Sequence, residues 1–453
     1  MRERFVSVWR RVLSLSWPVM VEQTTRTLMR TVDILVTALF SPVAVAAIGL
    51  ADLYARFPLW VGLGMGSGAI ALSSQDTGSG ATANRDEAIT QALGLGLLVG
   101  VPFAVGGVLY GEAAIALLGA PDEVARLGGQ YLAIVLATAP ARHVALIAAR
   151  SLQGTGDTRT PMYVNIVANG LNILGSLTLG LGLFGAPRLS IVGVGIATAG
   201  ANLFTAGVLV VALATDWADA NLTRPTDVVV TKQLLRVSAP SVAEGLVSTL
   251  AEFPLNAILL GFGTEVNAAF HIGRRLYQQL TGPLSRGFNV GASILVGQSL
   301  GAGDPETARF EGWATVALGI GTVGVFGLAL AVGARPFVSL FTDDAATVTY
   351  AVDFARVYGL TAGFLVTFSV LQGALAGASE TRAPFLARTS GMVLFMLGVT
   401  YVVGVVLGYG VLGAYFGIGL TYVWMAAVVA GSFHYSGWAE RAASMLEARG
   451  SVG

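Results

Sequence analysis

Long apolar stretches alternate along the chain with short clusters of glycine, proline, aspartate or arginine. A helix that crosses the hydrocarbon core of a membrane needs about 20 mostly apolar residues. Twelve stretches are long enough, and they predict spans near 14–40, 43–73, 88–110, 127–152, 161–184, 189–214, 236–260, 266–298, 308–331, 347–376, 384–407 and 411–435. The pattern therefore predicts an all-α integral membrane protein with twelve transmembrane helices.

Composition supports this interpretation. The chain has 453 residues, of which 54% are hydrophobic and 11% charged, whereas an ordinary soluble domain has roughly 25% charged residues. A soluble protein with a very large apolar core is the alternative, but so few charges would hardly keep its surface in water. Formal net charge is zero, so no basic face points to nucleic acid. Cysteine is absent, which excludes disulfides and thiolate metal sites.

The basic residues predict an orientation in the membrane. The N-terminus, the C-terminal tail and alternate connections carry fourteen Lys and Arg residues, whereas the opposite loops carry three. Basic residues concentrate in cytoplasmic loops, so both termini are expected in the cytoplasm, as an even number of spans requires. We expect a multi-pass protein of the cell (inner or plasma) membrane.

The two halves of the chain are repeats of each other. Ser16–Glu22 (SWPVMVE) returns as Ser238–Glu244 (SAPSVAE), 222 residues later. Asp157–Pro161 (DTRTP) meets Glu380–Pro384 (ETRAP) at an offset of 223. Each half holds six spans, and because six is even, both copies enter the membrane from the same side. Parallel repeats of this kind surround a central cleft in many secondary transporters.

The repeat also predicts the domains. Residues 1–215 form an N-terminal lobe of six helices, residues 236–453 form a C-terminal lobe of six, and the polar segment 216–235 is a cytoplasmic connection between them. The predicted fold is thus two parallel six-helix lobes around a central cleft.

One face of the first span is charged. Glu22, Arg26, Arg30 and Asp33 are spaced by four, four and three residues and so share a helical face. Each such group costs about 2.5–3.5 kcal/mol at the centre of a membrane helix, so the face should meet protein or a watery cavity. Either the four groups form a self-neutralising ladder of ion pairs, or they line the cleft and take part in gating.

Asp33 is the candidate coupling residue. At 1.5 Å per residue it lies about 28 Å from Ser14 along the helix, in the outer half of the membrane. The charge of a carboxylate at this depth depends on its neighbours and on its burial. It can therefore exchange a proton, a metal ion and a cationic substrate in competition, which is what an antiporter requires.

The matching face of the seventh span is acidic. It carries Glu244, Ser248, Glu252 and Leu255, so the aspartate has no counterpart there. We expect Glu244 and Glu252 to line the cleft and to take part in gating. We hypothesise that Glu252 meets Arg26 or Arg30 across the cleft and closes one state. The alternative is that Glu252 attracts cations into the cavity.

Three amides line one face of the fifth span. Asn165, Asn169 and Asn172 are spaced by four and three residues. They either join helices by hydrogen bonds or offer neutral oxygen ligands near Asp33. In the second case they would surround Na⁺ or water near Asp33.

The remaining charged and histidine side chains suggest no separate chemistry. We expect the charged side chains to lie near the membrane interfaces or to form ion pairs, and the two histidines of this group to be hydrogen-bonded packing residues. These residues are Asp52, Arg56, Arg142, His143, His271, Arg274, Arg275, Arg286, Asp353 and Arg356. The P-loop motif GxxxxGK[ST] does not occur, which excludes a self-powered ATP pump. Neither the HExxH or GxSxG motif nor a Cys/His metal cluster occurs, so no hydrolase or metalloenzyme site is indicated. We therefore expect a transporter, not an enzyme, without a cofactor other than bound H⁺ or Na⁺.

Several motifs resemble the multidrug and toxic compound extrusion family. The resemblance rests on Val32-Asp33, on Leu152–Tyr163 (LQGTGDTRTPMY) and on Gly193–Thr198 (GVGIAT), and it covers essentially the whole chain. It implies twelve helices in two lobes and the export of organic, often cationic compounds against inward protons or sodium ions.

The resemblance also favours a branch of the family. In sodium-driven norfloxacin exporters, acidic residues of the second lobe matter for ion coupling, and the matching positions here, near Ser248/Thr249 and Leu365, carry no acid. The chain is more similar to DNA-damage-inducible and archaeal exporters, which implies cation-coupling roles for Asp33, Asn172 and Thr198. If the ion is Na⁺, the resemblance makes Asp33 and Asn172 its expected ligands, with Asn169 as a secondary candidate. A further aspartate of that branch is Ser176 in this chain, which leaves the coupling ion open.

These observations predict an ion-coupled multidrug antiporter that works by alternating access. Its expected partners are the lipid bilayer and amphipathic small molecules, with no nucleic acid, and we expect a monomer. The alternative is a flippase of lipid-linked oligosaccharides or polysaccharides from the same superfamily. Such a flippase would line its cleft with arginine for the diphosphate, and Arg26 and Arg30 keep this alternative open.

Overall fold

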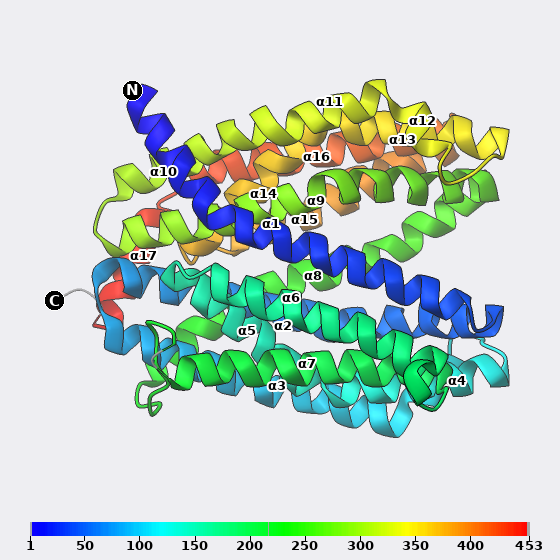
Figure 1. Ribbon diagram of the computed structural model, residues 1–453. Helices are drawn as coiled ribbons and strands as arrows, with labels where there is room; N and C mark the ends of the chain where they lie inside the picture. Colours follow the sequence, from blue (N-terminus) through cyan, green and yellow to red (C-terminus); the bar gives the residue numbers. More distant parts are fainter. Residues whose placement is uncertain (1, 216, 451–453) are drawn as a thin grey trace.

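The computed structural model describes residues 2–215 and 217–450, and the regular structure within them is helical. The helices run roughly parallel to one long direction and form two lobes, one above the other in Figure 1. The first described turn of α1 and the last turn of α17 lie at the same end (Figure 1), which we call the terminal end.

The N-terminal lobe is built from the first half of the chain. Its helices are α1 (Arg2–Ala38), α2 (Pro42–Ser79), α3 (Thr82–Ala116), α4 (Asp122–Ala137), α5 (Ala139–Thr155), α6 (Arg159–Gly175), the π-turn η1 (Ser176–Gly180), the short 3₁₀ turn η2 (Leu183–Gly185) and α7 (Ser190–Ala214).

The C-terminal lobe repeats this order. Its helices are α8 (Val228–Phe262), α9 (Thr264–Gly301), α10 (Pro305–Gly319), η3 (Ile320–Gly324), α11 (Val325–Val332), α12 (Ala334–Val338), α13 (Ala345–Leu360), α14 (Ala362–Gly377), α15 (Arg382–Ser390), η4 (Gly391–Val406) and α16 (Val411–Tyr435), followed by α17 (Trp438–Ala448). Helix α8 already begins at Val228, inside the predicted connection 216–235.

The helices match the predicted spans in order. Within the described residues, eight are long and apolar enough to cross a membrane, or up to ten if each of two bent pairs is one span. The bent pairs are α4 with α5 (48°) and α13 with α14 (50°). The two predicted spans that remain are α1 and α9, whose charged side chains lower their hydropathy. Several of these charged side chains line a cavity between the lobes.

Equivalent signals end equivalent helices in the two lobes. Gly80 follows α2 with φ +77°, and Gly303, at the matching position of the repeat, follows α9 with φ +76°. Glycine adopts this left-handed conformation without the steric penalty of a side chain. After Gly303, the Asp304 carboxylate caps α10 by accepting a hydrogen bond from the Thr307 backbone N–H at 2.9 Å.

Two equivalent crossings of helices help to join the lobes. Helix α1 packs against α9 of the other lobe, and α8 packs against α2. Both crossings use a glycine, because a Cβ there would collide with the facing side chain. The contacts occupy equivalent positions of the repeat: Ser16 with Gly291, Met20 with Gly287, Ser238 with Gly68, and Val242 with Gly64.

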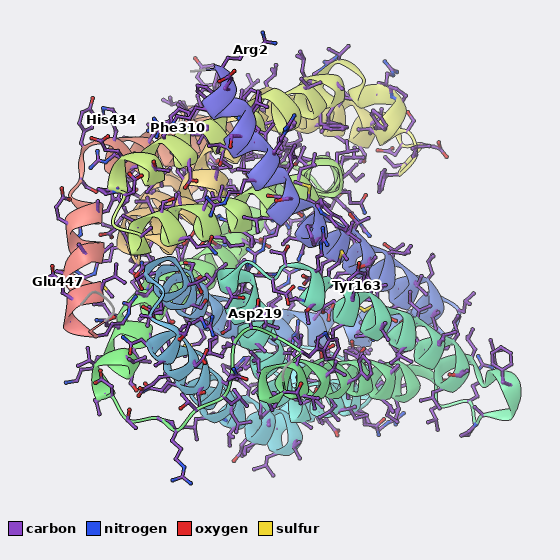
Figure 2. The ribbon with its side chains drawn as sticks, turned by 60° about the vertical axis from the view of Figure 1, so that its left-hand side comes forward. Arg2, Tyr163, Asp219, Phe310, His434 and Glu447 are labelled. Carbon is purple, nitrogen blue, oxygen red and sulfur yellow. The ribbon has the colours of Figure 1, made fainter. Side chains whose placement is uncertain are left out.

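The two lobes also meet closely at the terminal end. The Gln75 side-chain amide donates to the Gly377 carbonyl at 2.7 Å across the lobes. Arg449, just beyond α17, forms an ion pair with Asp76 at 2.8 Å, and both side chains are fully buried. Arg449 also donates to Gln233 of α8 at 2.8 Å. Helix α17 thus lies across the ends of both lobes (Figure 2).

Candidate functional site

A cavity of about 810 Å³ lies between the two lobes. Its walls come from α1, α2 and α4–α7 on one side and from α8 and α9 on the other. The lining residues of α1 belong to its second half, and those of α9 to its first half. The cavity therefore lies away from the closed terminal end.

Asp33 of α1 lies on the N-lobe side of this cavity, in a pocket of polar side chains. The Ser176 hydroxyl donates to one Asp33 carboxylate oxygen at 2.7 Å. In the orientation that satisfies both of its ends, the Asn172 amide donates to the two Asp33 oxygens at 3.1 and 3.2 Å and accepts from the Thr198 hydroxyl at 3.1 Å. We call Asp33, Asn172, Ser176 and Thr198 the Asp33 pocket.

The local structure of the fifth span explains how two of these side chains converge. Asn172 and Ser176 are four residues apart, so they share one face of the helix that packs against α1. Ser176 begins the π-turn η1, and such turns inside helices are frequent at functional sites. Both side chains are buried, whereas Asp33 is partly accessible from the cavity.

The chemistry of the pocket suits a small, singly charged cation. It offers one carboxylate together with neutral amide and hydroxyl oxygens. Among the described residues, no group of three or more His, Cys, Asp or Glu side chains could hold a metal ion. A hard divalent cation usually takes several carboxylates or carbonyl oxygens, so a proton or Na⁺ fits this donor set better.

The other two asparagines of the fifth span lie outside the Asp33 pocket. The Asn169 amide donates to the Thr25 hydroxyl of α1 at 3.2 Å. Thr25 lies about two helical turns before Asp33 on α1. The Asn165 amide donates to the Pro161 carbonyl of its own helix at 2.8 Å. Asn169 therefore joins α6 to α1, and Asn172 is the amide that reaches the aspartate.

The predicted charged stripe of α1 lies along the cavity wall. Glu22 and Arg26 form an ion pair at 2.9 Å within the helix, as the ladder alternative expects. Arg30 and Asp33 form no ion pair within 4.0 Å in the described part of the chain. The predicted series of ion pairs along α1 is thus incomplete. Arg30 and Asp33 both line the cavity, but they do not pair with each other.

The hypothesis for Glu252 is wrong in its partner. Glu252 of α8 lies 2.9 Å from Arg274 of its own lobe and 3.4 Å from Arg56 of α2. It does cross the cleft, but to Arg56 and not to Arg26 or Arg30. Arg26 is held by Glu22 one turn away on its own helix, so its side chain is already occupied.

Glu244 does not belong to the cleft. It is buried inside the C-terminal lobe, where Arg388 of α15 forms an ion pair with it at 2.5 Å and Gln372 of α14 donates to it at 2.6 Å. It is absent from the cavity lining among the described residues. The expectation of a gating role for Glu244 therefore needs correction, since its carboxylate binds helices within one lobe.

More arginines line the cavity than the sequence predicts. Eight guanidinium groups face it, and four carboxylates accompany them. Arg150 lies near the end of the predicted span 127–152, and α5, which continues to Thr155, places it in the cavity wall. The arginines are Arg26, Arg30, Arg56, Arg142, Arg150, Arg274, Arg275 and Arg286. The unusually low hydropathy of the eighth span was the available signal for three of them.

Two of the three histidines, His143 and His271, differ in their surroundings. His143 is fully buried, and its ring nitrogens lie 2.7 Å from the Pro58 carbonyl and 3.2 Å from the Gly96 carbonyl. It is a packing residue, as expected. His271 instead lines the cavity, where its Nε2 lies 2.9 Å from the Asn256 side-chain oxygen.

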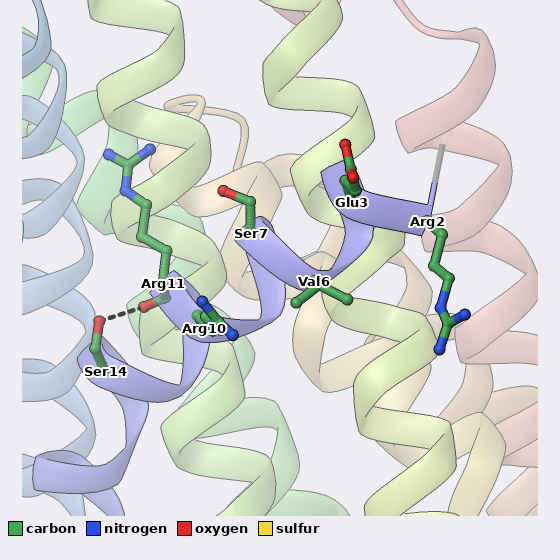
Figure 3. Close-up of a pocket in the computed structure, with 7 residues that line it drawn as sticks. All are labelled: Arg2, Glu3, Val6, Ser7, Arg10, Arg11 and Ser14. Atoms are coloured by element: carbon green, nitrogen blue, oxygen red, sulfur yellow. Dashed lines mark hydrogen bonds between the residues drawn. The ribbon is translucent and has the colours of Figure 1, made fainter.

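A second hollow lies along the exposed start of α1 at the terminal end (Figure 3). One helix supplies its lining, which includes Arg2, Arg10 and Ser14. The Ser14 hydroxyl donates to the Arg11 carbonyl of the same helix at 2.8 Å. A hollow built from one exposed helix face encloses no ligand, so the cavity between the lobes is the better candidate.

The chain matches known transporters over most of its length. A family model described as MatE matches residues 18–178 and 240–409, one match in each half. A relative in Rhodopseudomonas palustris, described as a probable multidrug resistance protein NorM, is 29% identical over 446 residues, covering 94% of this chain and 93% of its own. A multidrug resistance protein NorM of Burkholderia vietnamiensis is 28% identical over 355 residues, covering 75% of each chain.

Solved structures show the same fold. A transporter of the MOP superfamily from Pyrococcus furiosus, reported with a binding pocket of reverse polarity, has a TM-score of 0.85 at 19% identity and covers 96% of each chain. An outward-facing multidrug resistance MATE transporter has a TM-score of 0.83 at 19% identity, also over 96% of each chain. The predicted all-α fold of two lobes is therefore confirmed.

Proposed function

The chain belongs to the MatE family, and we propose that it is a secondary active multidrug exporter that antiports amphipathic organic compounds against inward H⁺ or Na⁺. The family and the relatives indicate a multi-pass membrane transporter, and their descriptions support multidrug efflux. The direction of transport, the coupling ion and alternating access belong to the proposal.

The Asp33 pocket is the observation that carries this proposal. Hydrogen bonds from Ser176 and Asn172 tie the Asp33 carboxylate of α1 to the fifth span. A proton or Na⁺ that binds Asp33 changes its charge and therefore the strength of these bonds. Helix α1 also packs against α9 of the other lobe, so ion loading at Asp33 acts on a helix that contacts both lobes.

The arrangement of the lobes suits alternating access. Buried contacts close the terminal end, and the cavity lies toward the other end. We propose that the terminal end is cytoplasmic, in the cell membrane, because the basic residues of the connections gather there. In this orientation the cavity opens outward, and rocking the lobes would close it and open the terminal end.

Efflux from cells that express the full chain tests the proposal. We expect wild-type cells to export at least one of two dyes, the cation ethidium and the anion carboxyfluorescein, and the Asp33→Asn variant to export neither. The matched control is Asp353→Asn, the same change at a half-exposed carboxylate of α13 outside the cavity lining in the described part of the chain, which should export normally. Replacing Na⁺ by choline at fixed pH then identifies the ion, because only a Na⁺-driven exporter stops. Normal efflux by the Asp33→Asn variant would refute the proposal.

A flippase of lipid-linked sugars is the second candidate, and the arginines favour it. Eight guanidinium groups in one cavity are a natural setting for a diphosphate, because arginine binds phosphate oxygens in pairs. Reconstituted vesicles separate the two functions. A flippase would move a fluorescent lipid-linked diphosphate between leaflets, whereas an exporter would accumulate a soluble dye.

A further inference from the structure

The charges that line the cavity are unbalanced. Eight arginines face four carboxylates, and ion pairs account for only part of them. Glu22 pairs with Arg26, and Glu252 is shared by Arg56 and Arg274. The other five arginines have no carboxylate within 4.0 Å in the described part of the chain: Arg30, Arg142, Arg150, Arg275 and Arg286. An organic cation would meet a cavity whose net charge is already positive.

Two of these arginines line the cavity from opposite lobes. Arg150 belongs to α5 of the N-terminal lobe and Arg286 to α9 of the C-terminal lobe. Helices α5 and α9 contact each other, and both guanidinium groups line the same cavity together with Arg26 and Glu22 of α1. Helices α1, α5 and α9 thus bring three guanidinium groups and one carboxylate together.

Glu22 does not neutralise this group. One of its oxygens accepts a hydrogen bond from Arg26 at 2.9 Å. The other oxygen is buried and accepts none from the described residues, so neither Arg150 nor Arg286 uses it. Arg150 instead donates to the side-chain oxygen of Gln153, at 3.2 Å. The group formed by Glu22, Arg26, Arg150 and Arg286 therefore carries an excess of positive charge, which comes from both lobes.

The fold holds Arg150 in this place. Its methylene stem passes over Gly66 of α2, where a Cβ would lie 2.7 Å from the Arg150 Cγ. Keeping charged groups with too few partners inside a membrane protein is costly. A ligand that supplies the missing negative charge would remove this penalty and bridge the two lobes.

We propose that the transported compounds carry an anionic group, a carboxylate, sulfonate or phosphate, that binds between Arg150 and Arg286. Arginine matches such groups because its planar fork gives two parallel hydrogen bonds. This inference rests on the proposed function and specifies its substrate class. It departs from the cationic compounds that the family resemblance implies. The anion site is separate from the Asp33 pocket, so the coupling ion and the substrate act through the helices that connect them.

Equilibrium dialysis of the purified full-length protein in detergent tests the proposal. The probes are carboxyfluorescein as a soluble anion, farnesyl diphosphate as an isoprenoid-linked anion, and ethidium as a cation. We expect wild-type protein to bind an anion, and Arg150→Gln and Arg286→Gln each to weaken that binding about tenfold or more, as for the loss of a charged hydrogen bond. The control is Arg335→Gln, which is exposed on α12 outside the cavity lining and should bind as wild type does.

The outcomes separate this inference from the proposed function. Tighter binding of carboxyfluorescein supports a soluble organic anion as substrate, whereas tighter binding of farnesyl diphosphate supports the flippase; both uphold an anion site. Binding of ethidium but neither anion would overturn the inference while leaving an exporter in place. Wild-type anion affinity in both arginine variants would also overturn it, provided that they elute and melt like wild type.

Discussion

The two lobes share a backbone plan but differ in what they place against their first helix. In the N-terminal lobe, an aspartate accepts hydrogen bonds from an asparagine and a serine. The C-terminal lobe is apolar at nearly all equivalent positions: Leu255 for Asp33, Met392 for Asn169, Phe395 for Asn172 and Val399 for Ser176, with Thr421 alone matching Thr198. The duplication supplies the scaffold, and one copy alone carries the candidate ion site.

A second difference concerns the glutamate that both lobes retain. Glu22 faces the cavity, whereas Glu244 pairs with Arg388 inside its lobe. Arg388 stands at the position of Asn165 in the repeat, and an asparagine there cannot neutralise a glutamate. The same residue type therefore serves the cavity in one lobe and internal packing in the other.

The largest expected effect comes from Asp33 and its counterpart. Asp33→Asn should reduce dye efflux to the level of cells without the transporter, because an amide does not bind the coupling ion as a carboxylate does. Adding Leu255→Asp to this variant should not restore efflux, because no Asn and Ser pair faces that position. Restored efflux in the double variant would show that the lobes are interchangeable.

Breaking the hydrogen bonds around Asp33 should have a smaller effect. Ser176→Ala and Asn172→Leu each remove a donor to the carboxylate, and a hydrogen bond to a charged group contributes about 1.5–3 kcal/mol. We expect the ion concentration for half-maximal transport to shift by about tenfold, seen in a titration of efflux against pH and Na⁺. Val399→Ala and Phe395→Leu are the matched variants in the other lobe and should leave the titration unchanged.

The retained glutamates should separate stability from transport. Glu244→Gln weakens a mostly buried ion pair and should lower the free energy of unfolding by about 1–3 kcal/mol, which a lower melting temperature of the purified protein would report. Transport per folded molecule should persist. Glu22→Gln should in addition alter transport per folded molecule, because Glu22 lines the cavity, whereas its ion pair with Arg26 is buried to a similar extent. Normal transport per folded molecule of Glu22→Gln would contradict the contrast.

The smallest effect is expected for the pair that bridges the lobes beside the cavity. Arg56 and Glu252 are 3.4 Å apart and partly exposed, and exposed pairs contribute about 0.2–1 kcal/mol. Arg56→Gln should therefore change the transport rate less than about fivefold. The reversed pair Arg56→Glu with Glu252→Arg should come closer to wild type than Arg56→Glu alone. Arg274 limits this recovery because it also contacts Glu252.

The sequence predicts the spans and the Asp33 pocket better than it predicts the cavity. Asp33 is predicted from the charged face of the first span, and the family motifs add Asn172 and Thr198. Ser176 was expected as a departure from the family's aspartate, and only the structure shows that it donates to Asp33. Asn169 was grouped with them because it shares the Asn172 face, yet it contacts Thr25 further along α1. Sequence spacing shows which residues share a face of one helix. It does not show which residue of the neighbouring helix each of them contacts.

The arginines of the cavity were not foreseen because their positions depend on packing between the lobes. Arg150 lies near the end of a predicted span, and whether it enters the cavity depends on how far α5 continues and on Gly66 of the helix beside it. Glu252 reaches Arg56 because of the way α8 crosses toward α2. Contacts between distant helices of this kind leave no pattern in the sequence of either helix.

The central claim is that ion coupling resides in the N-terminal lobe, at Asp33. The most direct measurement compares two activities of the Asp33→Asn variant in reconstituted vesicles, using the dye that the wild type transports. We expect the variant still to exchange labelled for unlabelled dye across the membrane but not to accumulate the dye under an imposed H⁺ or Na⁺ gradient. Accumulation at the wild-type level under that gradient would contradict the claim.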